Sequence, residues 1–165
     1  MMTIADVNAL APVDFIARFG DVAEHSPWVA REAFAQRPFE DRDAMVEAFA
    51  TALKSANPDA QRALIRAHPD LATKARLTAD SSREQAGVGL DALSEEEFAR
   101  FTSLNAAYKD RFGLPFIFAV KGATKQTILA AFEERVSHSP EAEFVTAIAQ
   151  ICRIFRFRIE DRVAA

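Results

Sequence analysis

The chain has 165 residues, of which half are hydrophobic and 27% are charged, as is typical of one globular domain. Its net charge of −4 argues against nucleic acid as the main partner, because phosphate binding needs a basic face. No apolar run approaches the roughly 20 residues that a membrane-spanning helix needs. We therefore expect a single domain over residues 1–165, with neither a membrane nor a nucleic acid as partner.

In the first half of the chain, apolar residues recur with a helical period, and Gly or Pro separates the periodic segments. Strand patterns bounded by tight turns are absent, so we predict an all-α fold, a bundle of about seven to eight helices. Ser26 is expected to cap the second helix, with Pro27 at its first helical position. The helices predicted here are Asp14 to Phe19, Trp28 to about Pro38, Asp41 to Ala56, and Pro58 to about Arg66 with Asn57 as its cap.

In the second half, Ser94-Glu95-Glu96-Glu97 forms a capping box, which predicts a helix that carries Phe98, Phe101, Leu104 and Tyr108. Further helices are predicted from Thr124 to Val136 and from about Ser139 to Ile159. The segment 71–93 gives the weakest pattern. His138 is predicted to lie at the surface, in the turn before the last helix.

Three short polar motifs interrupt the helical pattern between residues 67 and 117. Each places titratable or backbone-exposing residues beside Pro or Gly, as a site mounted on a helical scaffold would. A histidine and a glutamate brought together can move protons near neutral pH without any cofactor. The motifs are Ala67-His68-Pro69-Asp70-Leu71, Ser81-Ser82-Arg83-Glu84-Gln85-Ala86-Gly87 and Phe112-Gly113-Leu114-Pro115-Phe116-Ile117.

Each motif also has a structural explanation. His68 follows a helical run and precedes a proline, so it can cap a helix C-terminus. Ser81 and Glu84 have the S-x-x-E spacing of a capping box, which by itself favours a cap over catalysis. A cap does not explain Gln85, whose amide can bond an amide-rich ligand. The third motif fits a buried connection between helices as well as a backbone that binds a small planar ligand.

Other signatures narrow the choice of function. Cys152 is the only cysteine, which excludes an intramolecular disulfide and indicates a reducing cytoplasm. Three separated histidines argue against a zinc site, and no P-loop, Rossmann fingerprint, H-E-x-x-H or G-x-S-x-G motif is present. Arg156 and Arg158 lie on opposite margins of the last helix's buried stripe, and either guanidinium could hold a carboxylate.

The motifs occur in one order along the chain, and the series resembles a known family. It closely resembles the 2-oxo-4-hydroxy-4-carboxy-5-ureidoimidazoline (OHCU) decarboxylases of urate degradation, over about residues 8–163. The series comprises Glu24-His25-Ser26-Pro27-Trp28-Val29-Ala30, Arg37-Pro38-Phe39, Ala67-His68-Pro69-Asp70-Leu71-Ala72, Ser81-x-x-Glu84-Gln85-Ala86-Gly87-x-Gly89-Leu90, Phe112-Gly113-Leu114-Pro115-Phe116-Ile117, Lys121-Gly122 and Arg156-Phe157-Arg158-Ile159.

The resemblance implies an all-α homodimer that needs no cofactor and decarboxylates OHCU to (S)-allantoin. It implies that His68 and Glu84 are catalytic. Ser82 remains an alternative to Ser81, because it is a serine one position away. Arg156 likewise remains an alternative to Arg158, because it is an arginine two positions away. The implied substrate-binding residues are Pro69, Ser81, Gln85, Phe116, Ile117 and Arg158.

The chemistry suits these residue types. Loss of CO₂ leaves an electron pair that a neighbouring ring carbonyl or imine can delocalise, so the enzyme must hold a carboxylate, polarise the ring and deliver a proton to one face. The sequence leaves open whether His68 or Glu84 protonates the carbon. Two other functions also stay open. One is a helical interaction module without catalysis, and the other is a hydrolase of a related ureide, in which the same pair would activate water.

Overall fold

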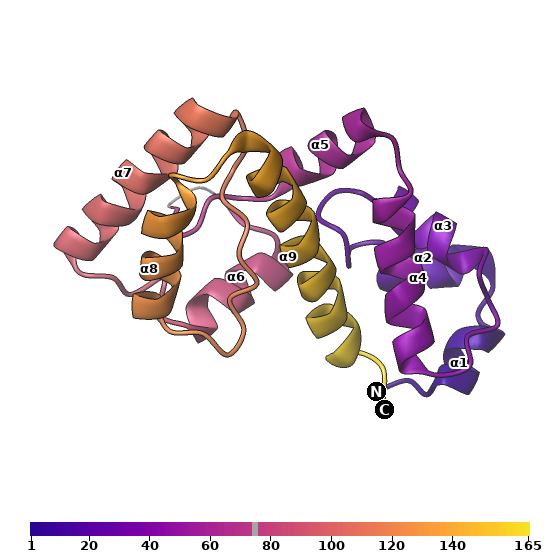
Figure 1. Ribbon diagram of the computed structural model, residues 1–165. Coiled ribbons are helices and arrows are strands. Elements are labelled where there is room, and N and C mark those ends of the chain that lie inside the picture. Colours follow the sequence, from indigo (N-terminus) through magenta and orange to yellow (C-terminus); the bar gives the residue numbers. More distant parts are fainter. Residues whose placement is uncertain (74–75) are drawn as a thin grey trace. The chain divides into compact units, whose positions relative to one another are not determined.

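A computed structural model describes residues 1–73 and 76–165 (Figure 1). The described residues contain nine helices and no strand, which confirms the all-α prediction. The short helices α1 and α6 account for the difference from the seven helices located in the sequence. The helices are α1 (Ile4–Ala9), α2 (Pro12–Phe19), α3 (Trp28–Phe34), α4 (Arg42–Lys54), α5 (Pro58–Ala67), α6 (Ala79–Gly87), α7 (Glu95–Phe112), α8 (Lys125–Arg135) and α9 (Pro140–Glu160).

The helices belong to two compact units. Unit 1 comprises residues 1–67 and 151–165, and unit 2 comprises residues 68–150. Helix α9 contributes its first half to unit 2 and its second half to unit 1. A single domain over residues 1–165 therefore stays a prediction.

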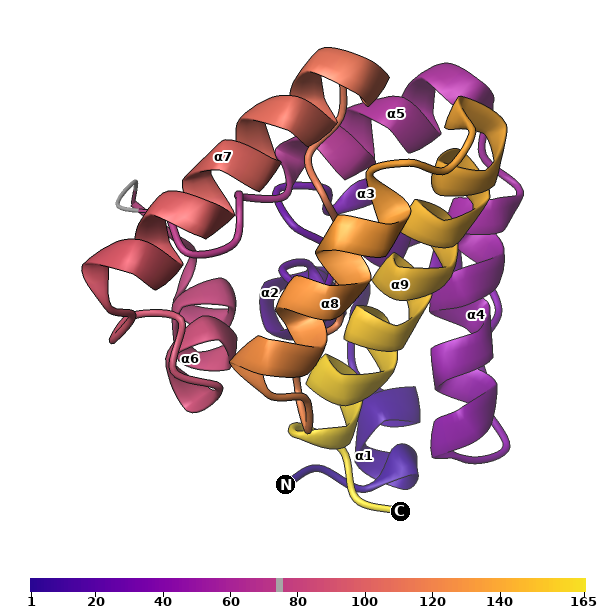
Figure 2. The ribbon, with the colours of Figure 1, turned by 60° about the vertical axis from the view of Figure 1, so that its left-hand side comes forward.

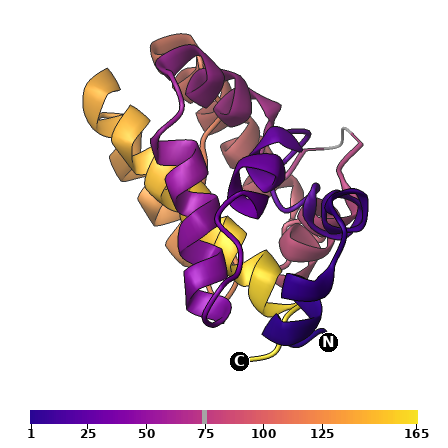
Figure 3. The same cartoon turned by 90° about the vertical axis from the view of Figure 1, so that its right-hand side faces the viewer.

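Unit 1 has a core of packed phenylalanine rings. Phe15, Phe49 and Phe155 are fully buried. The ring centroids of Phe49 and Phe155 lie 6.2 Å apart, edge to face, so α4 packs alongside the second half of α9 (Figure 3). Aromatic pairs in this arrangement contribute about 0.5–1.5 kcal/mol beyond the burial of their area. Both chain ends belong to this unit, where Met2 and Val163 form a parallel bridge.

Two helix starts of unit 1 follow the sequence, and one does not. The side chains of Asp41 and Asn57 accept backbone hydrogen bonds at the starts of α4 and α5, as predicted. The prediction that Ser26 caps α3 is wrong. The Ser26 hydroxyl donates instead to the carbonyl oxygen of Glu24 at 2.8 Å, and Pro27 precedes the first residue of α3. Helix α3 therefore begins without a side-chain cap.

Helix α7 of unit 2 begins and ends where the sequence indicates. The Ser94 hydroxyl accepts from the backbone N–H of Glu97, and the Glu97 carboxylate accepts from the N–H of Ser94. At the other end, Gly113 has a φ of 66°, in the left-handed region that glycine adopts without steric cost. This turn releases the chain into an extended segment, residues 114–120.

The extended segment passes through the aromatic core of unit 2. The rings of Phe116 and Phe132 stack with centroids 3.8 Å apart, and Phe132 also contacts Phe101 across the neighbouring helices α7 and α8 (Figure 2). Leu71 and Ala72 belong to the same apolar cluster as Phe116. The residues just after His68 and the third sequence motif are therefore held by one core.

Candidate active site

His68 lies immediately after the last residue of α5, at the helix end that the sequence predicted. Its side chain is buried, with 8% of the residue exposed. Residues 68–72, which we call the His68 loop, follow α5 and are the first residues of unit 2. Ala72 in this loop has a φ of 56°, a left-handed conformation that alanine rarely adopts. Such a conformation persists only where surrounding contacts hold it.

Two buried amide side chains provide such contacts. Gln85 on α6 accepts a hydrogen bond from the Ala72 N–H at 2.9 Å and donates one to the Asp70 carbonyl at 3.1 Å. Asn105 on α7 donates through Nδ2 to the Leu71 carbonyl at 2.9 Å. The backbone of the His68 loop is therefore bound from two helices.

Helix α6 begins earlier than the S-x-x-E pattern indicates. Thr78 is its N-cap, and the Thr78 hydroxyl accepts from the N–H of Ser81 at 3.3 Å. Ser81 and Glu84 therefore lie inside the helix, and their interpretation as a capping box is wrong. Because Thr78 supplies the cap, capping no longer explains the presence of Glu84.

One face of α6 is turned toward the His68 loop. Residues three or four positions apart share a helix face, so Ser81 lies on the same side as Glu84 and Gln85. Gln85 bonds the loop backbone, which fixes the direction of this face. Ser81 is buried and Glu84 is half-buried, whereas Ser82 is exposed. Among the two serines, Ser81 is thus the buried one.

The backbone of the third motif is bound by a buried arginine. Arg135 donates through Nη1 to the Ile117 carbonyl at 2.7 Å, and its guanidinium carbon lies 4.3 Å from the centroid of the Phe116 ring. Two residues further, the Ala119 N–H donates to the Gln150 side chain at 2.9 Å. These side chains replace the backbone partners that the extended segment lacks.

A fully buried carboxylate, Glu143, anchors this arginine. Glu143 Oε1 accepts from Arg135 Nε at 2.9 Å and from the Tyr108 hydroxyl at 2.6 Å. Burial, and next the hydrogen bond to Glu143, raise the pKa of Tyr108 well above its usual range. His138, predicted at the surface, has a 38% exposed side chain and lies 3.1 Å from Glu143 Oε2. Sequence reasoning missed this cluster, since no motif links its members.

Arg158 and Arg156, which helical geometry could not distinguish, have opposite environments within unit 1. Arg158 is 2% exposed, with Nη2 at 2.8 Å from Glu24 Oε1 and Nη1 at 3.2 Å from the Val22 carbonyl. Arg156 is 42% exposed and pairs with Asp43 at 2.8 Å. The arginine that the family motif favours is the buried one.

Comparison with known proteins identifies the family. The family model described as OHCU decarboxylase matches residues 8–160. The chain belongs to the OHCU decarboxylase family. It is 40% identical over 164 residues to the 2-oxo-4-hydroxy-4-carboxy-5-ureidoimidazoline decarboxylase of Haloferax volcanii, covering 99% of this chain and 98% of that protein. It is 32% identical to the mouse protein of the same name, covering 99% and 94%.

Three further similarities accompany the family assignment. The chain is 40% identical to a uric acid degradation bifunctional protein of Bacillus subtilis, where 98% of this chain matches 33% of that protein. A crystal structure of (S)-allantoin synthase superposes with a TM-score of 0.79 at 32% identity, covering 98% of this chain and 54% of that chain. An OHCU decarboxylase structure determined in the presence of (S)-allantoin has a TM-score of 0.69 at 20% identity, covering 85% and 93%, and supports the fold.

The family's motif residues are distributed over both units of this OHCU decarboxylase. Arg158 belongs to unit 1. Within the described residues, no three His, Cys, Asp or Glu side chains are grouped so that they could hold a metal ion. No helix in the described part of the chain is long and apolar enough to cross a membrane. The motif residues of unit 2 are His68, Pro69, Ser81, Glu84, Gln85, Phe116 and Ile117.

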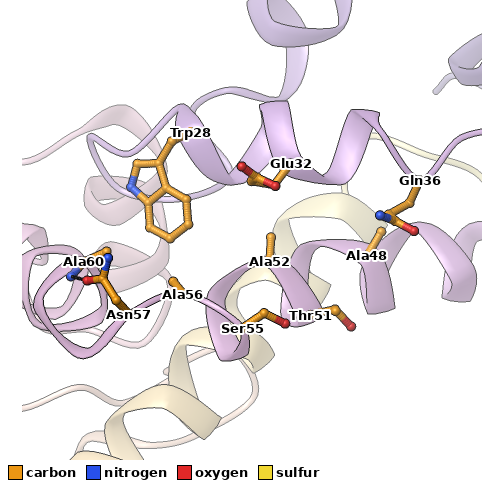
Figure 4. A pocket seen from close by; sticks show the side chains of 10 residues that line it. All are labelled: Trp28, Glu32, Gln36, Ala48, Thr51, Ala52, Ser55, Ala56, Asn57 and Ala60. Carbon is orange, nitrogen blue, oxygen red and sulfur yellow. Dashed lines mark hydrogen bonds between the residues drawn. The ribbon is translucent and has the colours of Figure 1, made fainter.

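Pockets lie in each of the two units of this family member. The first pocket, of about 420 Å³, lies in unit 1. Helix α3 forms one side of it, and α4 with the start of α5 forms the other. Figure 4 shows Trp28, Glu32 and Gln36 on one side of it and small side chains on the other. Trp28 belongs to the first motif of the series, but none of the expected catalytic or substrate-binding residues lines this pocket. The second, of about 380 Å³, lies in unit 2 and is lined by Asp70 and Ala72 of the His68 loop and by Asn105.

Proposed function

We propose that this protein is a carboxy-lyase that converts OHCU to (S)-allantoin in urate degradation, without a cofactor. Family membership over residues 8–160 carries the proposal. The structure of α6 supports it, because Thr78 supplies the cap and Ser81 and Glu84 lie inside the helix whose Gln85 bonds the His68 loop. An interaction module would not need these side chains there.

The reaction requires three proton movements. Cleavage of the bond to the carboxylate releases CO₂, and the electron pair enters the neighbouring ring imine, whose nitrogen takes up one proton from solvent. In the product the hydroxyl-bearing carbon is a carbonyl and the ureido-bearing carbon carries a hydrogen. A second proton must therefore leave the hydroxyl group, and a third must reach the neighbouring carbon on a single face. We assign the hydroxyl and carbon transfers to His68 and Glu84, whose side chains can exchange protons near neutral pH.

The substrate contacts follow from the remaining motif residues. We assign the carboxylate to Arg158, because a buried guanidinium binds carboxylates through a planar fork. We assign the ring and ureido amides to the Ser81 hydroxyl and the Gln85 amide. The Gln85 amide has two N–H groups and two lone pairs and uses one of each on the loop, so one of each remains for substrate. Pro69, Phe116 and Ile117 would contact the ring.

We further propose that the protein works as a homodimer in the cytoplasm. The dimer follows from the family resemblance. The cytoplasm is supported by cysteine usage, since the lone Cys152 cannot form an intramolecular disulfide. Equilibrium ultracentrifugation at several protein concentrations tests the dimer.

The decisive experiment adds the protein to freshly prepared urate oxidation product and follows circular dichroism and CO₂. The spontaneous route gives racemic allantoin, so a lasting optical signal with CO₂ release supports the proposal. Release of ammonia or urea would show a ureide hydrolase instead. A time course identical to the spontaneous one would leave a helical interaction module as the function.

A further inference from the structure

Three side-chain hydrogen bonds converge on the backbone of the His68 loop. Gln85 bonds the Ala72 N–H and the Asp70 carbonyl, and Asn105 bonds the Leu71 carbonyl. Three consecutive loop residues are thus held by side chains of α6 and α7. This bracing acts on the loop that begins at His68, although neither amide side chain is hydrogen-bonded to the His68 ring.

The braced conformation is one that the loop would not adopt by itself. The left-handed φ of Ala72 carries a steric cost of about 1–2 kcal/mol for a residue with a Cβ atom. The amide of Gln85 accepts from the N–H of that same residue. Loss of the bracing would therefore let the backbone relax toward an ordinary conformation, and the relaxation would move the preceding residues.

Asn105 has a property that stability alone does not account for. Both it and Gln85 are more than nine-tenths buried. The Asn105 Nδ2 atom bonds Leu71, but its Oδ1 atom is buried without a hydrogen-bond partner among the described residues. A buried polar atom left unpaired costs about 1–3 kcal/mol. An apolar residue of the same size would avoid this cost. The asparagine is therefore better explained by the position in which its hydrogen bond holds the loop.

We propose that Asn105, together with Gln85, is a positioning residue that holds the His68 loop in the conformation in which His68 reacts. The proposal rests on the proposed function, in which His68 transfers a proton. Asn105 acts through the Leu71 backbone and does not contact the substrate. Its loss should therefore lower kcat and leave KM largely unchanged.

The principal test replaces Asn105 with leucine, which keeps the volume and removes the donor. We expect kcat to fall on the order of 10–100-fold with KM changed less than about threefold, because a displacement of about 1 Å can cost about 10²-fold. Asn105→Asp keeps the shape, loses the donor and should have a comparable effect. Retention of kcat by a folded Asn105→Leu variant would overturn the proposal.

Asn8→Leu is the matched control. Asn8 in unit 1 also holds a loop backbone, donating to the Phe39 carbonyl and accepting from the Phe39 N–H, both at 2.8 Å. This variant should lose stability and keep kcat. An equal loss of kcat in both variants would show that general destabilisation, and not the position of the loop, lowers turnover, and it would count against the proposal.

A second readout does not depend on turnover. The chain has three histidines, so ¹⁵N-labelled imidazole spectra resolve the His68 ring. In Asn105→Leu we expect the His68 ring signals to shift while those of His25 and His138 stay, and the Ala72 amide to exchange faster. Unchanged His68 signals would overturn the positioning role even if the enzyme acted on another substrate. Failure of His68→Asn to reduce activity would instead overturn the proposed function.

If neither Asn105 variant folds, the wild-type protein still provides a test. The hydrogen bond to Gln85 predicts slow exchange of the Ala72 amide, by at least about 100-fold relative to an unstructured peptide. Exchange at the rate of an unprotected amide would show that the loop is not held, and the proposal would fall.

Discussion

The Nη2 atom of Arg158 lies 2.8 Å from Oε1 of Glu24, and neither side chain is more than 2% exposed, although 134 residues separate them. The pair joins the loop before α3 to the second half of α9 within unit 1. Removing one partner of a buried ion pair leaves a charge without compensation, which costs about 3–5 kcal/mol. The substrate-binding role proposed for Arg158 therefore depends on Glu24.

Glu24→Gln should destabilise unit 1 by about 3–5 kcal/mol, because the buried guanidinium of Arg158 would lose the carboxylate that lies 2.8 Å from it. Chemical denaturation followed by circular dichroism measures the loss. Asp43→Asn is the control: it breaks the exposed pair with Arg156 and should change the free energy of unfolding by less than about 1 kcal/mol. Equal effects of the two substitutions would contradict the importance of burial.

His68→Asn should keep the fold and reduce kcat by about 10²-fold or more, since asparagine cannot exchange a proton. Turnover is followed by the optical activity of the allantoin formed, and folding by far-ultraviolet circular dichroism. A well-folded variant with near wild-type kcat would remove His68 from the mechanism.

Glu84→Gln separates catalysis from helix capping more cleanly than the sequence suggested. Glu84 lies inside α6, where glutamine is also a good helix former, and Thr78 supplies the cap in both proteins. We expect activity to collapse and the melting temperature to stay within about 2 °C. The matched control is Thr78→Ala, which should cost about 1 kcal/mol through the lost cap. A Glu84→Gln variant that is unstable but active would contradict the catalytic assignment.

Tyr108 is the only tyrosine of the chain, so its ionisation can be followed at 295 nm. Its pKa is raised, so above pH 10 the unfolded chain loses this proton while the folded one keeps it, and stability must fall as pH rises. The slope contributed by this group is about 1.4 kcal/mol per pH unit. Tyr108→Phe should lack that slope. Tyrosinate absorbance appearing near pH 10 in the native protein would contradict the prediction.

Local sequence signals located most helices but misplaced the starts of α3 and α6. Ser94 with Glu97, and Asn57 with Pro58, mark helix starts because a cap depends on neighbours within one turn. At α6 the same reasoning selected Ser81 as the cap. The residue that caps the helix is Thr78, three residues earlier. When two N-cap positions fit the same sequence, the local pattern does not distinguish them. The packing around the helix decides which one is used.

The contacts that organise the candidate site could not be predicted in the same way. Asn105 reaches Leu71 across 34 residues, and Arg135 reaches Ile117 across 18. Each contact depends on how helices pack and not on the spacing of residues along one helix. The family resemblance supplied His68, Glu84 and Arg158 as candidates because a motif series preserves order in the chain, but it carries no information about the side chains that hold them.

The two arginines of α9 provide the last prediction. Arg158 is buried against Glu24, whereas Arg156 forms exposed pairs with Asp43 and Glu160. Lysine keeps the charge but not the planar fork of a guanidinium. Arg158→Lys should therefore raise KM or lower kcat by at least about tenfold.

Arg156→Lys should be nearly silent in the same assay, because an exposed pair contributes about 0–1 kcal/mol and lysine can still form it. Both variants are compared in KM and kcat on fresh OHCU and in melting temperature. A silent Arg158→Lys beside an impaired Arg156→Lys would assign the carboxylate to the surface arginine. The motif alignment would then shift by two residues, and the buried pair would be structural only.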